Sequence, residues 1–239
     1  MSGKPRVVVL LPTYDEAENI EPLARELLGL AVPGLEVCVV DDGSPDGTGK
    51  IVEDLAARAP GVRLLSRAGL PRGRGLAGRD GFLDALARGA EFIVEMDADF
   101  SHQPRHLPDL LEALKSCDVA VGSRLSRGGG DDRGPSRRIL SSLANAYARV
   151  LLGLPIRDVD SGYRAFTRAA LESIEPRTLR SRGPSIIHEV LFRASRRGLR
   201  VREIPIAFVD RKKGDSKLDW RKLASGCLFV LRLRALGSR

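Results

Sequence analysis

The chain has 239 residues, of which 43% are hydrophobic and 29% charged, so a sizeable core can form and wholesale disorder is excluded. Its formal net charge of +8 suits partners that carry phosphate, such as nucleic acid, anionic lipid headgroups or phosphorylated substrates. Aromatic residues make up only 5% and do not interleave with the basic residues, which disfavours single-stranded nucleic acid.

Apolar runs and helical repeats alternate along the first half of the chain. We predict buried strands over 7–11, 37–40, 62–65, 92–96 and 119–121, and helices over 16–28, 47–59, 76–87 and 107–114. Alternation at this spacing predicts an α/β fold in which a parallel sheet carries helices on both faces. Ligands bind to such sheets beyond the carboxyl ends of the strands.

The second half is less regular. Residues 126–135 are rich in Gly, Arg and Asp and predict a mobile loop, whereas 139–152 and 186–197 have helical patterns. Residues 158–164 are predicted to form a polar turn, and 201–209 an extended segment in which Pro205 is typical of an edge strand. We divide the chain into a main domain over 1–218 and a terminal helix over 219–239.

The cysteines and the N-terminus indicate in which cellular compartment we expect the protein. Cys38, Cys117 and Cys227 are far apart and form no Cys-x-x-Cys pair, which is typical of a reduced, cytosolic chain. The apolar run before Pro12 is too short for a signal peptide. No stretch approaches the roughly 20 apolar residues of a membrane span. We therefore expect a cytoplasmic protein.

Asp97 and Asp99 directly follow the predicted strand 92–96. In extended backbone, residues two apart point to the same side, so the two carboxylates can face one point. Carboxylates that close repel each other unless a proton or a cation lies between them. A hard divalent cation satisfies such a pair and commonly also holds phosphates. Asp-x-Asp alone is a weak signal, because acidic residues after strands commonly form turns, so the rest of the chain must support the metal site.

Polar clusters also follow three other predicted strands, at 12–14, 41–44 and 122–124. The carboxyl ends of parallel strands meet at one edge of a sheet, so these clusters and the acidic pair are predicted to share one rim. No strand leads into Gly-x-Gly-x-x-Gly, which argues against a nicotinamide or flavin site. The sequence thus predicts a metal-held, phosphate-bearing substrate at this rim.

Five motifs occur in order along the chain: PTYDEAENI at 12–20, VVDDGSPDGT at 39–48, EMDADFSH at 95–102, GSR at 122–124 and FVDRKKGDSK at 208–217. Each is modest alone, but their order and spacing are specific. Together they closely resemble the dolichyl- or polyprenyl-phosphate mannosyltransferases of glycosyltransferase family 2. The resemblance covers about 7–218, nearly the whole chain.

This resemblance implies a GT-A fold, which is a Rossmann-like, mostly parallel sheet, and transfer of mannose from GDP-mannose to a polyprenyl monophosphate. By analogy with the family, the nucleotide would lie against Pro12, Tyr14, Glu16, Val40 and Asp42. Mg²⁺ or Mn²⁺ and the diphosphate would be held by Asp97, Ala98 and Asp99, with Ser101 as a further metal ligand. Donor or acceptor phosphates would face Arg124, Arg211 and Lys217.

The chemistry of sugar transfer fits these residue types. A divalent cation held by Asp97 and Asp99 would stabilise the departing diphosphate, and Arg124, Arg211 and Lys217 would add fixed positive charge. A lipid phosphate is already anionic near neutral pH, so it needs positioning more than a strong general base. We therefore expect a single displacement with inversion, which gives a β-linked mannosyl phosphate.

Two alternatives stay open at this stage. A family 2 relative could use UDP-glucose or UDP-N-acetylglucosamine instead, because base selection depends on pocket detail. A Mg²⁺-dependent phosphatase of the haloacid-dehalogenase type also has Asp-x-Asp after a strand. In that class the motif follows the first strand, whereas here it follows the fourth, which disfavours the phosphatase.

Several other polar residues have a structural explanation beside a functional one. Glu16 could simply favour the start of a helix by its charge. Arg72, Arg74 and Arg79 could contact phosphate, but the prediction favours a solvated basic loop. A turn and an acceptor-side role are equally good explanations of Asp160 and Arg164. His102, His106 and His188 show no metal-ligand spacing, which favours surface or packing roles.

The C-terminal segment raises the question of membrane contact. Trp220, Leu223, Cys227, Leu228 and Leu231 fall on one side of a helix, with basic residues at both ends. Such an amphipathic helix can lie in the headgroup plane of a bilayer, although packing on the domain explains the pattern equally well. We expect reversible, peripheral association with the cytoplasmic face of an anionic membrane.

Overall fold

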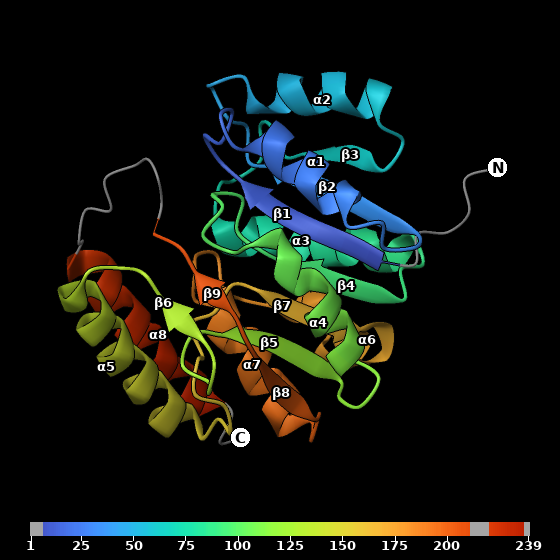
Figure 1. Ribbon diagram of the computed structural model, residues 1–239. Helices are drawn as coiled ribbons and strands as arrows, with labels where there is room; N and C mark the ends of the chain where they lie inside the picture. Colours follow the sequence, from blue (N-terminus) through green and yellow to red (C-terminus); the bar gives the residue numbers. More distant parts are fainter. Residues whose placement is uncertain (1–6, 211–219, 237–239) are drawn as a thin grey trace.

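The computed structural model describes residues 7–210 and 220–236 (Figure 1). The first half alternates strands and helices as predicted, in the order β1 Val7–Thr13, α1 Ile20–Gly29, β2 Leu35–Asp41, α2 Thr48–Arg58, β3 Val62–Ser66, α3 Arg74–Ala87, β4 Phe92–Glu95, α4 Leu107–Ala113 and β5 Val119–Ser123. The second half contains β6 Gly130–Asp131, α5 Pro135–Leu152, β7 Arg164–Thr167, α6 Arg168–Ile174, α7 Ile186–Arg196, β8 Val201–Pro205, β9 Ala207–Phe208 and α8 Trp220–Leu236.

Seven of the described strands form one sheet in the order β3-β2-β1-β4-β7-β5-β8. Neighbouring strands are parallel except at β7, which runs antiparallel to both β4 and β5. The predicted α/β fold with a mostly parallel sheet is therefore confirmed. The polar turn predicted over 158–164 was wrong for its last residue, because Arg164 begins β7 and is fully buried.

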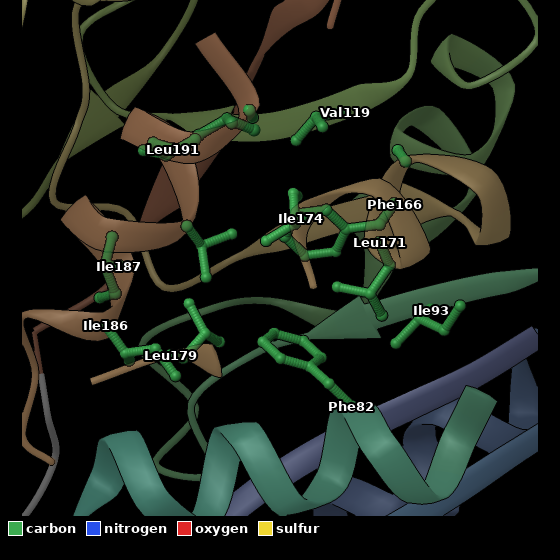
Figure 2. Packing of buried hydrophobic residues seen from close by; sticks show 14 of the residues in the cluster. Phe82, Ile93, Val119, Phe166, Leu171, Ile174, Leu179, Ile186, Ile187 and Leu191 are labelled. Carbon is green, nitrogen blue, oxygen red and sulfur yellow. The ribbon is translucent and has the colours of Figure 1, made fainter. Parts of the chain in front are cut away.

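Helices cover both faces of the sheet, because alternate residues of its central strands are apolar on opposite sides. Val8 and Leu10 of β1 belong to the core beneath α3, α6 and α7, and Val9 and Leu11 to the core beneath α1, α2 and α4. Figure 2 shows the first of these cores, where the rings of Phe82 and the β7 residue Phe166 meet edge to face.

Two expectations for local structure need correction. The segment 126–135, predicted as a mobile loop, contains strand β6, which pairs in parallel with β9. Helix α1 begins at Ile20 rather than at Glu16. The carbonyl of Glu16 instead accepts hydrogen bonds from the amides of Asn19 and Ile20, both at 3.0 Å, so Glu16 lies in the turn before the helix.

Helices α5 and α8 pack side by side at one end of the molecule (Figure 1). Val230 and Leu233 of α8 are buried, and the Tyr147 hydroxyl donates to the Cys227 carbonyl at 3.1 Å. The predicted C-terminal helix is thus present, while its amphipathic character and its separation as a domain at residue 219 stay predictions. Across 7–210 and 220–236, no helix combines the length and apolar character needed to cross a bilayer.

Candidate active site

The polar clusters predicted to share a rim do come together at the ends of β1, β2 and β4. Thr13 at the end of β1 is in register with Asp41 at the end of β2, and the Asp42 amide donates to the Thr13 carbonyl at 3.0 Å. On the other side of β1, Leu10 is in register with Glu95, the last residue of β4. Asp97 and Asp99 therefore leave the sheet beside segment 12–14, and segment 41–44 lies on the far side of 12–14.

The turn that carries the acidic pair is fixed by its own side chains. Phe100 has a positive φ of 61°, which reverses the chain after Asp99. The Asp99 Oδ1 then accepts hydrogen bonds from the Ser101 amide at 3.0 Å and the Ser101 hydroxyl at 2.6 Å. The role of Ser101 as a metal ligand stays a prediction, since in the structure its buried hydroxyl orients Asp99.

His102 packs under the same turn. Its Nδ1 accepts a hydrogen bond from the Asp97 amide at 3.3 Å, and its ring lies against those of Tyr163 and Phe208. Burial lowers the pKa of His102, although Asp97 and Asp99 act to raise it. A neutral imidazole with its proton on Nε2 fits both facts. His102 therefore has the packing role that the sequence favoured.

Asp97 lies open on the other side of this turn, where Gly162 approaches it closely. A Cβ atom on Gly162 would lie only 2.9 Å from Asp97 Oδ2, so any other residue would press on that carboxylate. The Asp97 side chain retains 32% of its accessible surface, whereas Asp99 is buried. Glycine at position 162 thus lets the backbone approach the Asp97 carboxylate without a side chain pressing on it.

The prediction that Arg74 lies in a solvated basic loop was wrong. It is the first residue of α3, and its guanidinium donates to Glu95 Oε1 at 2.6 Å and to Asp97 Oδ1 at 3.1 Å. The other oxygen of Glu95 accepts from Arg164, and both of these side chains are fully buried. Burial acts to raise the pKa of Glu95, but the two arginines lower it overall, so Glu95 is ionised.

The other two arginines of that predicted loop are also paired. The Arg72 guanidinium lies 4.8 Å from the centre of the Tyr14 ring and donates to the Tyr14 hydroxyl at 2.8 Å. Arg79 pairs with Asp80 at 3.1 Å. Tyr14 is exposed at the rim, where its flat face and the neighbouring cation suit a nucleotide base.

Asp42 directly follows β2 and is buried at the same rim. One carboxylate oxygen pairs with the buried Arg67, and the other accepts the Gly73 amide proton at 2.7 Å. These contacts connect the end of β2 to the start of α3 and give this part of the rim a fixed shape. Asp42 therefore has a clear structural task, and its contact with a nucleotide stays a prediction.

Arg124 is buried, and its guanidinium is paired with the carboxylate of Asp158. Its amide, Nε and Nη2 donate to the two oxygens of Asp158 at 3.0, 2.7 and 2.6 Å, and its guanidinium lies 5.1 Å from the centre of the Phe208 ring. This fork-to-fork geometry ties the end of β5 to the segment 158–163. A contact between Arg124 and phosphate stays a prediction beside this positioning role.

The remaining predicted residues divide into three groups. Pro12 and Glu16 lie at the rim, half-buried, and the Glu16 carboxylate accepts a hydrogen bond from Asn19 at 2.7 Å. The side chains of Val40 and Ala98 are buried in the two cores, so only their backbones can face a ligand. Arg211 and Lys217 lie outside the described residues.

The donor set at the rim fits a divalent cation that also binds substrate. In the described part of the chain, no three His, Cys, Asp or Glu side chains are grouped to hold a metal ion. Mg²⁺ and Mn²⁺ do not need such a cage, because Mg²⁺ is typically held by one or two carboxylates together with substrate phosphates. Asp97, open beside Gly162, and Asp99, oriented by Ser101, supply that kind of partial site.

An apolar cavity of about 320 Å³ lies between α5, α7 and α8. Leu143, Ala144 and Tyr147 of α5 and Val230 of α8 are among its lining residues. The polar part of its wall is Asp160 with His188, whose Nε2 lies 2.6 Å from Asp160 Oδ1. Asp160 stands two residues before Gly162, so one segment reaches both the cavity and Asp97.

The sequence of this chain was compared with those of known families and proteins. Residues 8–175 match the model of glycosyl transferase family 2. The chain belongs to glycosyltransferase family 2. It is 43% identical to undecaprenyl-phosphate mannosyltransferase of Micrococcus luteus over 228 residues, which cover 95% of this chain and 93% of that protein. The predicted glycosyltransferase resemblance is therefore confirmed, and the protein is an enzyme of this class.

Two further proteins are similar to this chain, one in sequence and one in fold. Polyprenol monophosphomannose synthase of Mycolicibacterium smegmatis is 43% identical over 219 residues, covering 89% of this chain and 81% of that protein. Glucosyl-3-phosphoglycerate synthase of Mycobacterium tuberculosis, solved with Mn²⁺ and UDP, superposes with a TM-score of 0.67. At 23% identity over 97% of this chain and 79% of that one, this likeness shows the fold alone and confirms the predicted GT-A architecture.

Sequence reasoning missed Asp158 and Asn145 as contributors to the site, and it ranked a phosphate contact of Arg74 below a solvated loop. Asn145 of α5 is buried, and its Oδ1 accepts the amides of Val159 and Asp160 at 2.7 and 3.1 Å, which fixes the segment between the cavity and Asp97. No local pattern marks Asn145, because its partners lie 14 and 15 residues further along the chain. A signal did exist for Arg74, since Glu95 ends an apolar strand and a buried carboxylate needs a cation.

Proposed function

We propose that this protein transfers mannose from GDP-mannose to the phosphate of a polyprenyl monophosphate, with inversion, in a reaction that depends on Mg²⁺ or Mn²⁺. The main observation behind this proposal is that segment 158–163 contacts a polar site and an apolar one. Gly162 lies against the metal-binding carboxylate Asp97, and Asp160 lines an apolar cavity. A polar donor and a lipid acceptor need this juxtaposition. The identity of 43% with two enzymes named for mannosyl transfer to polyprenyl phosphates supports it.

The residues of the chain suggest a division of labour. Bound by Asp97 and Asp99, a divalent cation would neutralise the charge that develops on the departing diphosphate. Tyr14 and Arg72 would seat the nucleotide at the rim. Asn145 and Asp158 hold segment 158–163 in place and thereby position the acceptor. A phosphate oxygen of the acceptor bonds to C1 of mannose as the bond from C1 to the β-phosphate oxygen breaks, and GDP leaves.

Transfer of label into organic solvent tests this function. The protein is incubated with polyprenyl phosphate and labelled GDP-mannose, UDP-glucose or UDP-N-acetylglucosamine, each with Mn²⁺ or with EDTA. We expect label from GDP-mannose to enter the lipid only with the metal, and NMR of the product to show the β-anomer. Label from a UDP-sugar instead would overturn the donor assignment, and an α-anomer would overturn the single displacement.

We propose that the apolar cavity between α5 and α8 holds part of the prenyl chain. Its lining residues are mostly apolar, and its volume of about 320 Å³ lies at the lower end for small-molecule pockets. Ala144→Phe would fill it from α5. We expect the KM for polyprenyl phosphate to rise about tenfold or more, because lost apolar burial of about 1.4 kcal/mol is a factor of ten.

Ala146→Phe is the matched control, because Ala146 is exposed on the same helix. Its KM for polyprenyl phosphate should equal that of the unmodified protein, and both variants should bind GDP with unchanged affinity. Equal lipid KM values for the two variants would place the prenyl chain elsewhere.

Peripheral membrane association at the cytoplasmic face is proposed on the outward sides of α5 and α8. Ile139, Leu143 and Val150 of α5 and Leu228 and Leu231 of α8 are exposed apolar side chains at this end of the molecule. We expect Leu228→Ser together with Leu231→Ser to reduce flotation with anionic liposomes at low salt severalfold. Leu70→Ser, an exposed leucine outside α5 and α8, should float like the unmodified protein. Equal flotation of all three proteins would refute this docking face.

A further inference from the structure

The guanidinium of Arg74 bridges a buried carboxylate and an open one. Nη1 donates to Glu95 Oε1 at 2.6 Å, and Nη2 donates to Asp97 Oδ1 at 3.1 Å. The Glu95 side chain is fully buried, whereas Asp97 keeps 32% of its surface and Arg74 keeps 19%. One edge of the guanidinium is therefore fixed in the interior, while the other reaches the carboxylate that faces the substrate.

The interior end of this bridge is held by packing on two sides. Glu95 Oε2 accepts from Arg164, whose Nη1 also donates to the Ile187 carbonyl at 3.2 Å. On the α3 side, a Cβ atom on Gly78 would lie 2.8 Å from Glu95 Oε1, so glycine leaves room for the carboxylate against the helix. Glu95 is thus a fixed anchor for Arg74.

The backbone that carries Arg74 is also held in place. The Gly75 amide donates to the Arg182 carbonyl at 2.9 Å. Cβ atoms on Gly73 and Gly75 would lie 2.2 Å from the Arg182 carbonyl oxygen and 2.3 Å from that of Ser181. Two glycines therefore let the start of α3 press against segment 181–182. Arg74 is pre-organised at the rim before any substrate binds, which reduces the cost of ordering it.

The positive charge of Arg74 affects the binding of both a metal ion and a diphosphate. Glu95 pairs with both Arg74 and Arg164, and Asp97 pairs with Arg74. Arg74 therefore adds one unit of positive charge directly beside Asp97. A neutral residue at position 74 would remove that unit, so the site would attract a bare cation more strongly and would attract a diphosphate more weakly once the cation is bound.

We propose that Arg74 is a further binding residue of the donor site: it weakens the hold of Asp97 on a bare metal ion and contacts the diphosphate of the sugar nucleotide once the metal is bound. This inference rests on the proposed function, since it assumes that Asp97 binds the metal of a nucleotide donor. It gives the site a preference for the metal–nucleotide complex over the metal alone.

Binding measurements on Arg74→Gln test the proposal without any turnover. Mn²⁺ alone is titrated by electron paramagnetic resonance, and GDP in the presence of saturating Mn²⁺ by calorimetry. We expect Mn²⁺ alone to bind at least about threefold more tightly than in the unmodified protein. GDP should bind about ten- to a hundredfold more weakly, because a hydrogen bond to a charged group is lost. Arg74→Lys, which keeps the charge, should restore most of the GDP affinity.

Arg25→Gln is the matched control, since it removes an exposed arginine paired with Glu21 on α1, and both affinities should stay unchanged. If Arg74→Gln lost affinity for both Mn²⁺ and GDP, Arg74 would have a merely structural role and the proposal would be overturned. Unchanged affinities for both ligands would overturn it as well. If the unmodified protein itself bound neither Mn²⁺ nor GDP with Mn²⁺, the proposed function would fail instead, so the two failures are distinguishable.

Discussion

Replacing both Asp97 and Asp99 by Asn should reduce turnover at least about a thousandfold. The two carboxylates are the only charged groups proposed to hold the metal, and metal stabilisation of a leaving group is worth several kcal/mol, with each 1.36 kcal/mol a factor of ten in rate. The same double variant should lose the dependence of GDP binding on Mn²⁺. Label transfer to lipid and calorimetric titration of GDP with Mn²⁺ or EDTA are the measurements.

Asn is close to Asp in shape, so the Ser101 hydrogen bond to position 99 and the packing of the turn should survive. An unchanged midpoint of urea unfolding would check this. Asp54→Asn is the control, because Asp54 is an exposed carboxylate on α2 paired with Lys50, and it should turn over normally. Full turnover in the double variant would remove the metal from the proposed mechanism.

The fold was predictable because its main strands are apolar runs that end in polar clusters. Val7 to Leu11 and Phe92 to Val94 are apolar enough for a doubly covered sheet, and the residues that follow them form the rim. Strand β7 was not predictable in this way. It has four residues and begins with Arg164, whose burial depends on Glu95, 69 residues away.

The site was predictable in its residue types more than in its contacts. The spacing of Asp97 and Asp99 predicts a metal position, which stays a prediction, and the structure orients Asp99 through Ser101 in a way that is compatible with it. Arg74 was misjudged because basic residues between glycines are typical of exposed loops. Its buried partner Glu95 lies 21 residues away, and nothing local indicates which arginine a buried glutamate will choose. Long-range ion pairs of this kind need the sheet topology first.

Glu95→Leu should destabilise the protein by about 3–5 kcal/mol, because it leaves the fully buried Arg164 without its carboxylate. Burial lowers the pKa of Arg164, although Glu95 acts to raise it, so the interior disfavours the guanidinium charge and Glu95 compensates for it. Its Nε is also buried without a hydrogen-bond partner within the described residues, which leaves no reserve contact. Urea unfolding followed by circular dichroism measures the loss.

The double variant Glu95→Leu, Arg164→Leu separates a lost ion pair from lost packing. Because apolar residues can replace a buried pair at little cost, this variant should be more stable than Glu95→Leu alone, in spite of its extra substitution. Glu21→Leu, at an exposed pair on α1, should change stability by less than about 1 kcal/mol. If the double variant were the less stable of the two, Glu95 would stabilise the fold through Arg74 and packing, and its pairing with Arg164 would contribute little.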